Sequence, residues 1–256
     1  MLQYITLFGL NFVSYSLCAV VGFCVALAFA FFRNRRNRIE DSAYYLFIFF
    51  AAIGMFVGSR LMFFISMIPT MIENDYTVHD ALMVLINGGF VFYGGLLGAL
   101  AGGVVCAKIS RIRLKELLNV FLPPMVVFHI FGRIGCFMAG CCYGIESPIG
   151  FSFPYEEVTR LPVPLMEAAY ELIIVVVLVY KDSKTQGKTD LTLLYLMMYA
   201  PMRFVLEYLR GDDIRGHWGL LSTSQWLSIF IVIVVVLCVY IQHRKNKARK
   251  DALQEV

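Results

Sequence analysis

Long, nearly uninterrupted apolar runs dominate the chain, and short polar segments separate them. Three of these runs read GFCVALAFAFF, LIIVVVLVY and WLSIFIVIVVVLCVYI. Together they exceed what the core of one soluble domain could bury, and about 20 apolar residues are enough to cross a bilayer as a helix. The pattern predicts an all-α integral membrane protein with seven transmembrane helices, near residues 13–32, 43–67, 89–107, 117–134, 163–180, 190–209 and 224–242.

The composition supports this prediction. Of the 256 residues, 59% are hydrophobic and only 16% are charged, whereas a soluble domain has about 25% charged residues. No internal repeat or low-complexity segment divides the chain. We therefore expect a single seven-span domain over residues 1–256, with an outer-face loop at 136–162 and a basic cytoplasmic tail at 243–256.

Basic residues follow alternate ends of the predicted spans. Sixteen of the 22 lysines and arginines lie in four clusters, after the first, third, fifth and seventh spans. Cytoplasmic loops carry an excess of Lys and Arg, so all four clusters are expected in the cytoplasm. This arrangement predicts an N-terminus outside and a C-terminus in the cytoplasm.

The other six basic residues are all arginines in the outer halves of the spans or in the outer loops. An arginine in or near the bilayer costs a few kcal/mol unless it is paired or solvated. The simple explanation is that the guanidinium snorkels toward the outer headgroups. For Arg160 and Arg215 this explanation and a functional role are equally favoured. A functional role is favoured for the other four, Arg60, Arg133, Arg203 and Arg210.

Two spacings place arginines beside other ionisable groups. His129 and Arg133 are four residues apart and share a helix face, whereas Arg203, Glu207 and Arg210 are spaced i, i+4 and i+7. Two arginines around one glutamate leave an excess positive charge, which suits an anion. Arginine binds phosphate through two N–H groups and stays protonated. The pattern favours a phospholipid headgroup, although an anion transporter would carry similar residues.

Two Gly-Gly pairs flank Tyr93 in the segment NGGFVFYGGLLGAL, residues 87–100. Glycines here would either let two helices approach closely or open a turn that lines a cavity, and close packing is favoured. The Tyr93 phenol could donate a hydrogen bond or act as an acid or base. It could equally be a tyrosine of the interfacial aromatic belt.

Three of the seven cysteines gather in GRIGCFMAGCCYG, residues 132–144, with the spacing C-x4-C-C. A packing or structural role is favoured for Cys136, Cys141 and Cys142. Zinc would need a fourth ligand, for which His129 is a possible partner. A disulfide and a redox-active pair remain open.

Six segments, in order and spread over the second to seventh predicted spans, resemble the motifs of the prolipoprotein diacylglyceryl transferase family. They read GSRLMFF, FYGGLLGAL, GRIGCFMAGCCYG, LPVPLMEAAYE, YAPMRFVLEYLRGD and LSTSQWLSI. The family's seven spans, outer N-terminus and cytoplasmic C-terminus agree with the topology that the charges predict.

The resemblance implies a transferase of the bacterial plasma membrane, with its active site toward the outer face. It would move the diacylglyceryl group of phosphatidylglycerol onto the lipobox cysteine thiol of a prolipoprotein and release glycerol phosphate. Its partners would be phosphatidylglycerol and lipobox-containing preproteins, with no metal, cofactor or nucleic acid. By matching position, Arg133 would bind the headgroup and Arg210 would lie near the catalytic centre. The other headgroup-binding positions would be Arg60, Arg203, Glu207, Gly94, Gly95 and Gly144.

Several polar positions of the family differ in this chain. Tyr93 stands where the family has the histidine before Gly-Gly-Leu, and Cys136 and Cys141 replace an asparagine and a glutamate of the signature. The base that takes the proton of the acceptor thiol would be Tyr93 or His129. The alternatives are a transferase with the same donor lipid and a different acceptor, an anion transporter, and a thiol-redox membrane enzyme.

Overall fold

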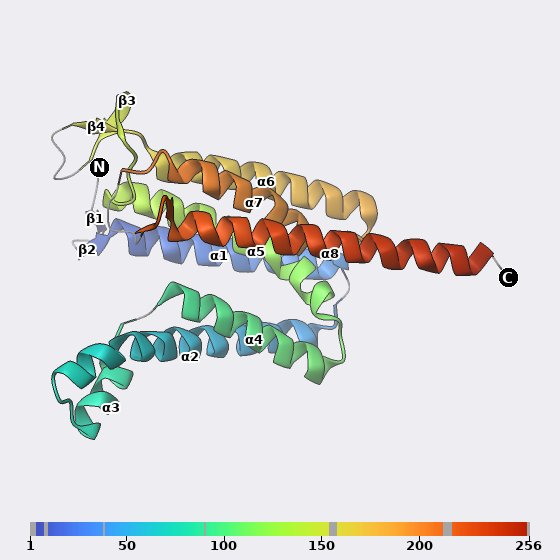
Figure 1. Cartoon of the computed structure of the whole chain (residues 1–256), viewed down its shortest axis with the longest axis horizontal. Helices are drawn as coiled ribbons and strands as arrows, with labels where there is room; N and C mark the ends of the chain where they lie inside the picture. The colour runs from blue at the N-terminus through green and yellow to red at the C-terminus, as the bar shows by residue number, and fades with distance from the viewer. Residues whose placement is uncertain are drawn as a thin grey trace. The chain divides into compact units, whose positions relative to one another are not determined.

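The computed structural model describes residues 4–7, 10–37, 39–89, 91–153, 158–211 and 217–254. Most of them are helical, and the strands form short two-stranded antiparallel sheets (Figure 1). The helices are α1 Ser14–Asn37, α2 Asp41–Glu73, α3 Val78–Asn87, α4 Phe92–Ser110, α5 Leu114–Ala139, α6 Val163–Thr185, α7 Leu191–Glu207 and α8 Thr223–Gln254. The strands are β1 Tyr4–Leu7, β2 Leu10–Val13, β3 Glu146–Ser152, β4 Thr159–Arg160, β5 His217–Trp218 and β6 Leu221–Ser222.

Six of the helices within the described ranges, α1, α2, α4, α5, α6 and α8, are long and apolar enough to cross a membrane. Helix α7 has 17 residues, which corresponds to about 25 Å. The seven predicted ranges coincide with these six helices and α7. The prediction of an all-helical protein with several membrane-length helices is therefore confirmed.

Helix α3 was not predicted from the apolar pattern, because its start depends on a local polar contact. The Thr77 hydroxyl accepts a hydrogen bond from the Asp80 N–H, and the Asp80 carboxylate accepts one from the Thr77 N–H. This reciprocal capping box satisfies two backbone donors at the first turn. Hydrogen bonds to the Thr77 side chain and backbone also hold the pKa of Asp80 below its usual value.

The chain forms two compact units, which we describe separately. One comprises Met1–Phe32 with Phe121–Val256, and the other comprises Arg33–Val120. The core of the first unit is a cluster of buried side chains from α5, α6 and α7: Leu122, Val126, Ile174, Val175, Leu178, Leu191 and Tyr195.

In the second unit, α2 and α4 pack backbone against backbone. A Cβ atom at Gly98 would collide with the carbonyl oxygen of Gly54, and one at Gly94 would collide with that of Gly58. Gly54 and Gly58 are four residues apart on α2, as are Gly94 and Gly98 on α4. This is the small-residue pattern that allows membrane helices to approach closely. The close-packing alternative for the glycine-rich segment is therefore the one that the structure shows.

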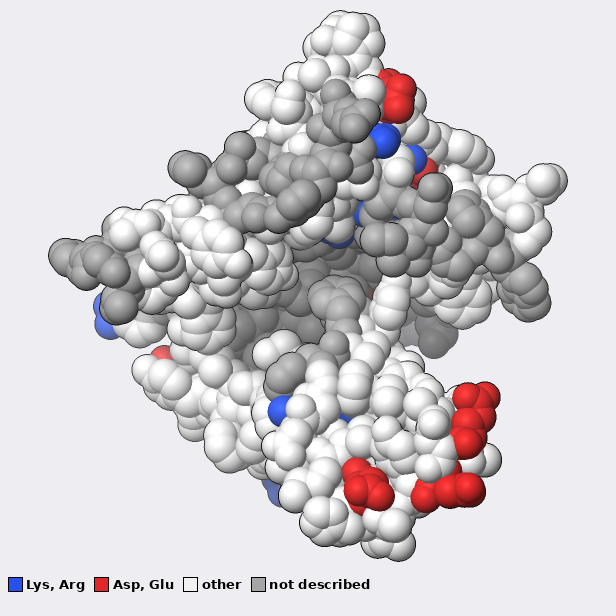
Figure 2. Space-filling model, turned by 90° about the vertical axis from the view of Figure 1, so that its left-hand side faces the viewer, with Lys and Arg blue, Asp and Glu red and all other residues white. Residues whose placement is uncertain are grey.

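Acidic side chains gather at the end of the second unit that α2 and α3 form (Figure 2). Glu73, Asp75 and Asp80 are all exposed there. No lysine or arginine occurs between residues 61 and 107. This end of the unit therefore carries a net negative charge.

Candidate functional site

A ladder of charged side chains joins α5 to α6 inside the first unit. Arg133 Nη2 lies 2.9 Å from Glu167 Oε1, and His129 Nδ1 lies 2.6 Å from Glu171 Oε1. His129 and Arg133 are four residues apart on α5, and Glu167 and Glu171 are four residues apart on α6, so each pair shares one face of its helix. The two glutamate side chains are fully buried, and the Arg133 side chain is only 15% exposed.

One hydrogen bond in this ladder identifies the accepting ring nitrogen of His129. Arg133 Nε donates to His129 Nε2 across 3.2 Å. Arginine can only donate, so Nε2 is the acceptor and the imidazole proton resides on Nδ1, where it is donated to Glu171. The lone pair of His129 Nε2 is therefore already engaged by Arg133, and Nε2 could accept a substrate proton only after that bond is released.

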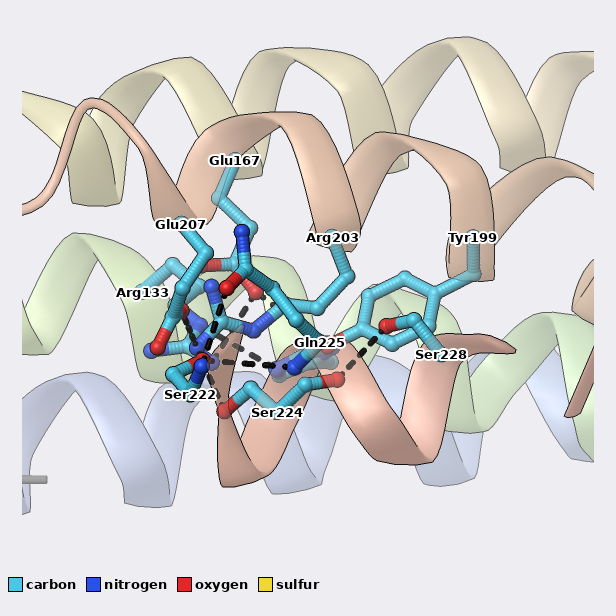
Figure 3. A network of polar contacts seen from close by, with 10 residues as sticks. Arg133, Glu167, Tyr199, Arg203, Glu207, Ser222, Ser224, Gln225 and Ser228 are labelled. Carbon is cyan, nitrogen blue, oxygen red and sulfur yellow. Dashed lines mark hydrogen bonds and ion pairs between the residues drawn. The ribbon is translucent and has the colours of Figure 1, made fainter. Parts of the chain in front are cut away.

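Helix α7 adds a tyrosine to the ladder. The Tyr199 hydroxyl donates to Glu167 Oε1 at 3.3 Å. Its ring stacks on that of Tyr195, with centroids 5.4 Å apart and the planes inclined by 13°. The stacking fixes the direction of the phenol, so Glu167 is held by both Arg133 and Tyr199 (Figure 3).

A second ion pair lies on α7. Arg203 Nη2 is 2.6 Å from Glu207 Oε2, and the same nitrogen donates to Ser224 Oγ of α8 at 3.2 Å. Both charged side chains are almost fully buried. The start of α8 is fixed by a capping box, in which Ser222 N–H donates to Gln225 Oε1 and Gln225 N–H donates to Ser222 Oγ. The box orients Ser224 toward Arg203, as Figure 3 shows.

Some buried polar atoms of these pairs have no hydrogen-bond partner among the described residues. They are Arg203 Nη1, Glu167 Oε2 and Glu171 Oε2. A buried polar atom without a partner costs about 1–3 kcal/mol. A bound ligand or water at these atoms would remove that cost, which is why such atoms mark a candidate binding site.

Backbone pairing places Arg210 beside the segment that follows α5. Gly144 forms a bridge with Arg210, and Gly211 N–H donates to the carbonyl oxygen of Tyr143 at 3.2 Å. A Cβ atom at Gly144 would lie 2.6 Å from the carbonyl oxygen of Leu209. Only glycine permits this approach, so Gly144 positions Arg210 through the backbone.

The three cysteines of the signature segment lie together at this end of α5, next to Arg210. Their sulfur atoms all lie within 4.8 Å of one another, and all three cysteines are free. Hydrogen bonds from the Cys136 and Cys141 thiols and the neighbouring Arg210 guanidinium lower the pKa of Cys142 below its usual value, against the opposing effect of burial. The structure thus shows these three cysteines as a cluster of free thiols, without a disulfide among them.

The other candidates for the base or for headgroup binding, Arg60, Tyr93, Gly94 and Gly95, belong to the second unit. Arg60 donates to the carbonyl oxygen of Gly88, and its guanidinium lies 5.7 Å from the centre of the Phe56 ring. Tyr93 is half-exposed at the start of α4. The two glycines that follow Tyr93 are buried against α2. Of the six arginines, Arg215 lies outside the described residues.

Sequence reasoning missed the carboxylates and the tyrosine of the ladder. It placed an excess of positive charge at Arg203, Glu207 and Arg210, whereas Glu167 and Glu171 add two negative charges to the first unit. A usable signal was present: two glutamates four residues apart in an otherwise apolar span are expensive unless paired, and so indicate a function.

Membrane-length helices with buried ion pairs between them define a multi-span membrane protein with a charged site inside its helical bundle. A family model described as prolipoprotein diacylglyceryl transferase matches residues 3–241. The chain belongs to the prolipoprotein diacylglyceryl transferase family.

Individual relatives agree with this assignment. The chain is 32% identical to phosphatidylglycerol–prolipoprotein diacylglyceryl transferase 2 of Clostridium perfringens, over 96% of each chain. It is 28% identical to the phosphatidylglycerol–prolipoprotein diacylglyceryl transferase of Clostridium tetani, over 89% of this chain and 92% of the relative. The enzyme of that name from Cupriavidus metallidurans is 30% identical, over 93% of this chain and 92% of the relative.

Proposed function

We propose that this protein transfers the diacylglyceryl group of phosphatidylglycerol to the cysteine thiol of a prolipoprotein. The thiol sulfur attacks the glyceryl carbon that carries the phosphate ester. The carbon–sulfur bond forms as the carbon–oxygen bond breaks, and glycerol phosphate leaves with the electron pair. The thiol proton passes to a base, for which Tyr93 and His129 are the candidates.

The observation that carries this proposal is the cluster of arginines inside an apolar helical bundle. Arg133 and Arg203 are held by glutamates, yet each guanidinium has five N–H donors and the carboxylates use only some of them. Arg203 Nη1 is buried without a partner among the described residues. Donors of this kind, held in a site that excludes water, suit the phosphate of a lipid and stabilise the charge that develops on it as it leaves.

Arg210 is proposed to act near the reacting phosphate. Gly144 supports this role because its bridge to Arg210 sets the position of that backbone. Arg60, Gly94 and Gly95 are further proposed headgroup-binding positions, by their correspondence to the family motifs.

We further propose seven spans within one domain, with α7 as the shortest span and the site toward the outer face of the bacterial plasma membrane. The N-terminus would then be outside and the C-terminus in the cytoplasm. The end formed by α2 and α3 supports this topology, because it lies between spans two and three and the sequence has no lysine or arginine between residues 61 and 107. Cytoplasmic loops are instead rich in Lys and Arg.

Complementation tests the proposed activity. A strain depleted of its own diacylglyceryl transferase should regain mature lipoproteins and growth when it expresses this chain, and should not regain them with the Arg133→Ala variant. Arg113→Ala is the matched control, because Arg113 is an 82% exposed arginine paired with Glu116. Normal protein levels of all variants with no restored lipoproteins by the parent chain would refute the proposal.

A related transferase with the same donor lipid and another acceptor is the second candidate. The observation that favours it is the cluster of Cys136, Cys141 and Cys142, since two of these positions replace polar residues of the family signature. Lipoprotein profiling separates the two functions: cells that lack the chain would keep normal lipoproteins while a different diacylglyceryl product disappears from their lipid extract.

A further inference from the structure

The turn after α5 brings Cys136 and Cys141 together by a known helix-ending geometry. Gly140 has a left-handed φ of 78°, its N–H donates to the carbonyl oxygen of Phe137, and the Cys141 N–H donates to that of Cys136. This pair of hydrogen bonds is the Schellman motif, with Gly140 just past the helix end. In this motif the side chains of the first and sixth residues, here Cys136 and Cys141, come into contact.

Cys142 completes the cluster at an energetic cost. Its φ is 61°, and the left-handed conformation costs roughly 1–2 kcal/mol for a residue with a Cβ. A residue held in this strained conformation often belongs to a ligand clamp. Here the strain accompanies a third thiol, so that three sulfur atoms lie within 4.8 Å of one another.

We infer that Cys136, Cys141 and Cys142 form a three-thiolate site for a thiophilic divalent cation, Zn²⁺, whose fourth coordination position takes the acceptor thiol. Zinc–sulfur bonds of about 2.3 Å in a tetrahedral site set sulfur–sulfur separations of about 3.8 Å, which the cluster reaches with small side-chain adjustments. A disulfide would join only two of the three sulfurs and would bring them to about 2.05 Å.

The fourth position is open in the part of the chain that the structure describes. No described histidine, aspartate, glutamate or further cysteine joins the three sulfurs. Cys141 is exposed, so a ligand from outside can reach the cluster. Three protein ligands with one free position are typical of catalytic rather than structural zinc sites.

The neighbouring charges suit such a site. Three thiolates and one Zn²⁺ carry a net charge of −1, and the Arg210 guanidinium beside Cys142 compensates it. Cys136 is three residues after Arg133 and lies on the same face of α5. The bound cation would therefore lie next to both arginines that are proposed to bind the lipid phosphate.

The chemistry of the bound thiol follows from the metal. A thiol that coordinates Zn²⁺ loses its proton to water and binds as the thiolate. The thiolate sulfur then forms the carbon–sulfur bond, and glycerol phosphate leaves with the electron pair of the broken carbon–oxygen bond. This role rests on the proposed function, because it supplies the activation of the acceptor thiol for which neither Tyr93 nor His129 would then be required.

The metal site is tested on the full chain in lipid nanodiscs, without reference to activity. Purified protein reloaded with Zn²⁺ should hold about one ion per chain by elemental analysis. Cys141→Ala and Cys142→Gly should lose the ion, since each removes one thiolate and glycine keeps the left-handed conformation. Cys24→Ala, which removes an exposed cysteine of α1, should retain it. Equal helix content by circular dichroism shows that the variants are folded.

A second measurement uses the unaltered chain. Co²⁺ in place of Zn²⁺ should give the visible spectrum of a tetrahedral sulfur-rich site, and a cysteine-containing lipobox peptide should change that spectrum while its serine analogue does not. No stoichiometric metal in protein whose seven thiols are reduced would overturn the inference, as would equal metal content in all variants. Two thiols missing from the native thiol count would show a disulfide instead and would overturn it too.

The two proposals fail separately. Arg133→Ala should keep the metal and lose diacylglyceryl transfer. A chain that binds Zn²⁺ and responds to the peptide but transfers nothing would refute the proposed function and leave the metal site standing. Full transfer by protein stripped with a chelator would overturn the role of the cation in activating the thiol.

Discussion

The Arg133–Glu167 ion pair joins α5 and α6 in the buried ladder, and it should be coupled energetically as well as geometrically. Loss of one partner of a buried pair costs about 3–5 kcal/mol, because it leaves an uncompensated charge, whereas replacement of both by apolar side chains is often neutral or stabilising. Glu167 is fully buried and Arg133 is 15% exposed. We therefore expect Arg133→Met to lie toward the upper end of that range and Glu167→Met toward the lower end.

Thermal unfolding in nanodiscs measures these effects. In a chain of this size about 1 kcal/mol corresponds to roughly 2–4 °C in Tm, so the Glu167→Met variant should unfold about 6–12 °C below the parent chain. The double variant should recover most of the lost Tm and still fail to transfer diacylglyceryl groups, because Arg133 is the proposed phosphate ligand. The control is the double methionine variant of Arg113 and Glu116, an exposed pair whose loss should change stability by about 0–1 kcal/mol.

Two results would contradict this reasoning. If the Tm loss of the double variant equals the sum of the two single losses, the side chains are not coupled and the ladder does not stabilise the bundle. If the double variant transfers at the parental rate, Arg133 has no part in lipid binding, whatever its effect on stability.

Three further results are expected. Gly98→Ala should lower Tm, since overpacking costs about 1–3 kcal/mol, whereas Gly132→Ala should not, because a Cβ there meets nothing within 4 Å; equal Tm values would contradict the close packing of α2 and α4. Gly144→Ala should lower the rate of transfer, as measured by lipoprotein labelling, while Tm changes little. Unchanged transfer would contradict the positioning of Arg210 by Gly144. Tyr93→Phe or His129→Ala should abolish transfer if that residue is the base, and full activity of both variants would show that neither is.

The membrane helices could be predicted from the sequence because their signal is local. Runs such as LIIVVVLVY have one stable solution in a bilayer, in which every backbone polar group is satisfied within the helix. Helix α3 and the turn at Gly140 also depend on local rules, namely the Thr77–Asp80 capping box and the Schellman motif. They were missed because the apolar pattern alone does not contain them.

The ion-pair ladder could be predicted only in part. Arg203 and Glu207 are four residues apart, so the spacing along one helix contains their pairing. Arg133 and Glu167 lie on different helices, and no spacing along the chain tells which helices adjoin. The positive charge expected from one helix alone was therefore compensated by a neighbour that the sequence did not identify.

This compensation changes how a lipid phosphate would be recognised. Arginines in a low-dielectric bundle need counter-charges before the lipid arrives, and Glu167 and Glu207 supply them. At Arg133 and Arg203 the site then offers hydrogen-bond donors rather than uncompensated charge, and a hydrogen bond to a charged group contributes about 1.5–3 kcal/mol. Lipid selection should accordingly follow the geometry of the guanidinium donors, above all the buried Arg203 Nη1, and depend little on the ionic strength of the medium, which screens exposed charges far more than buried ones.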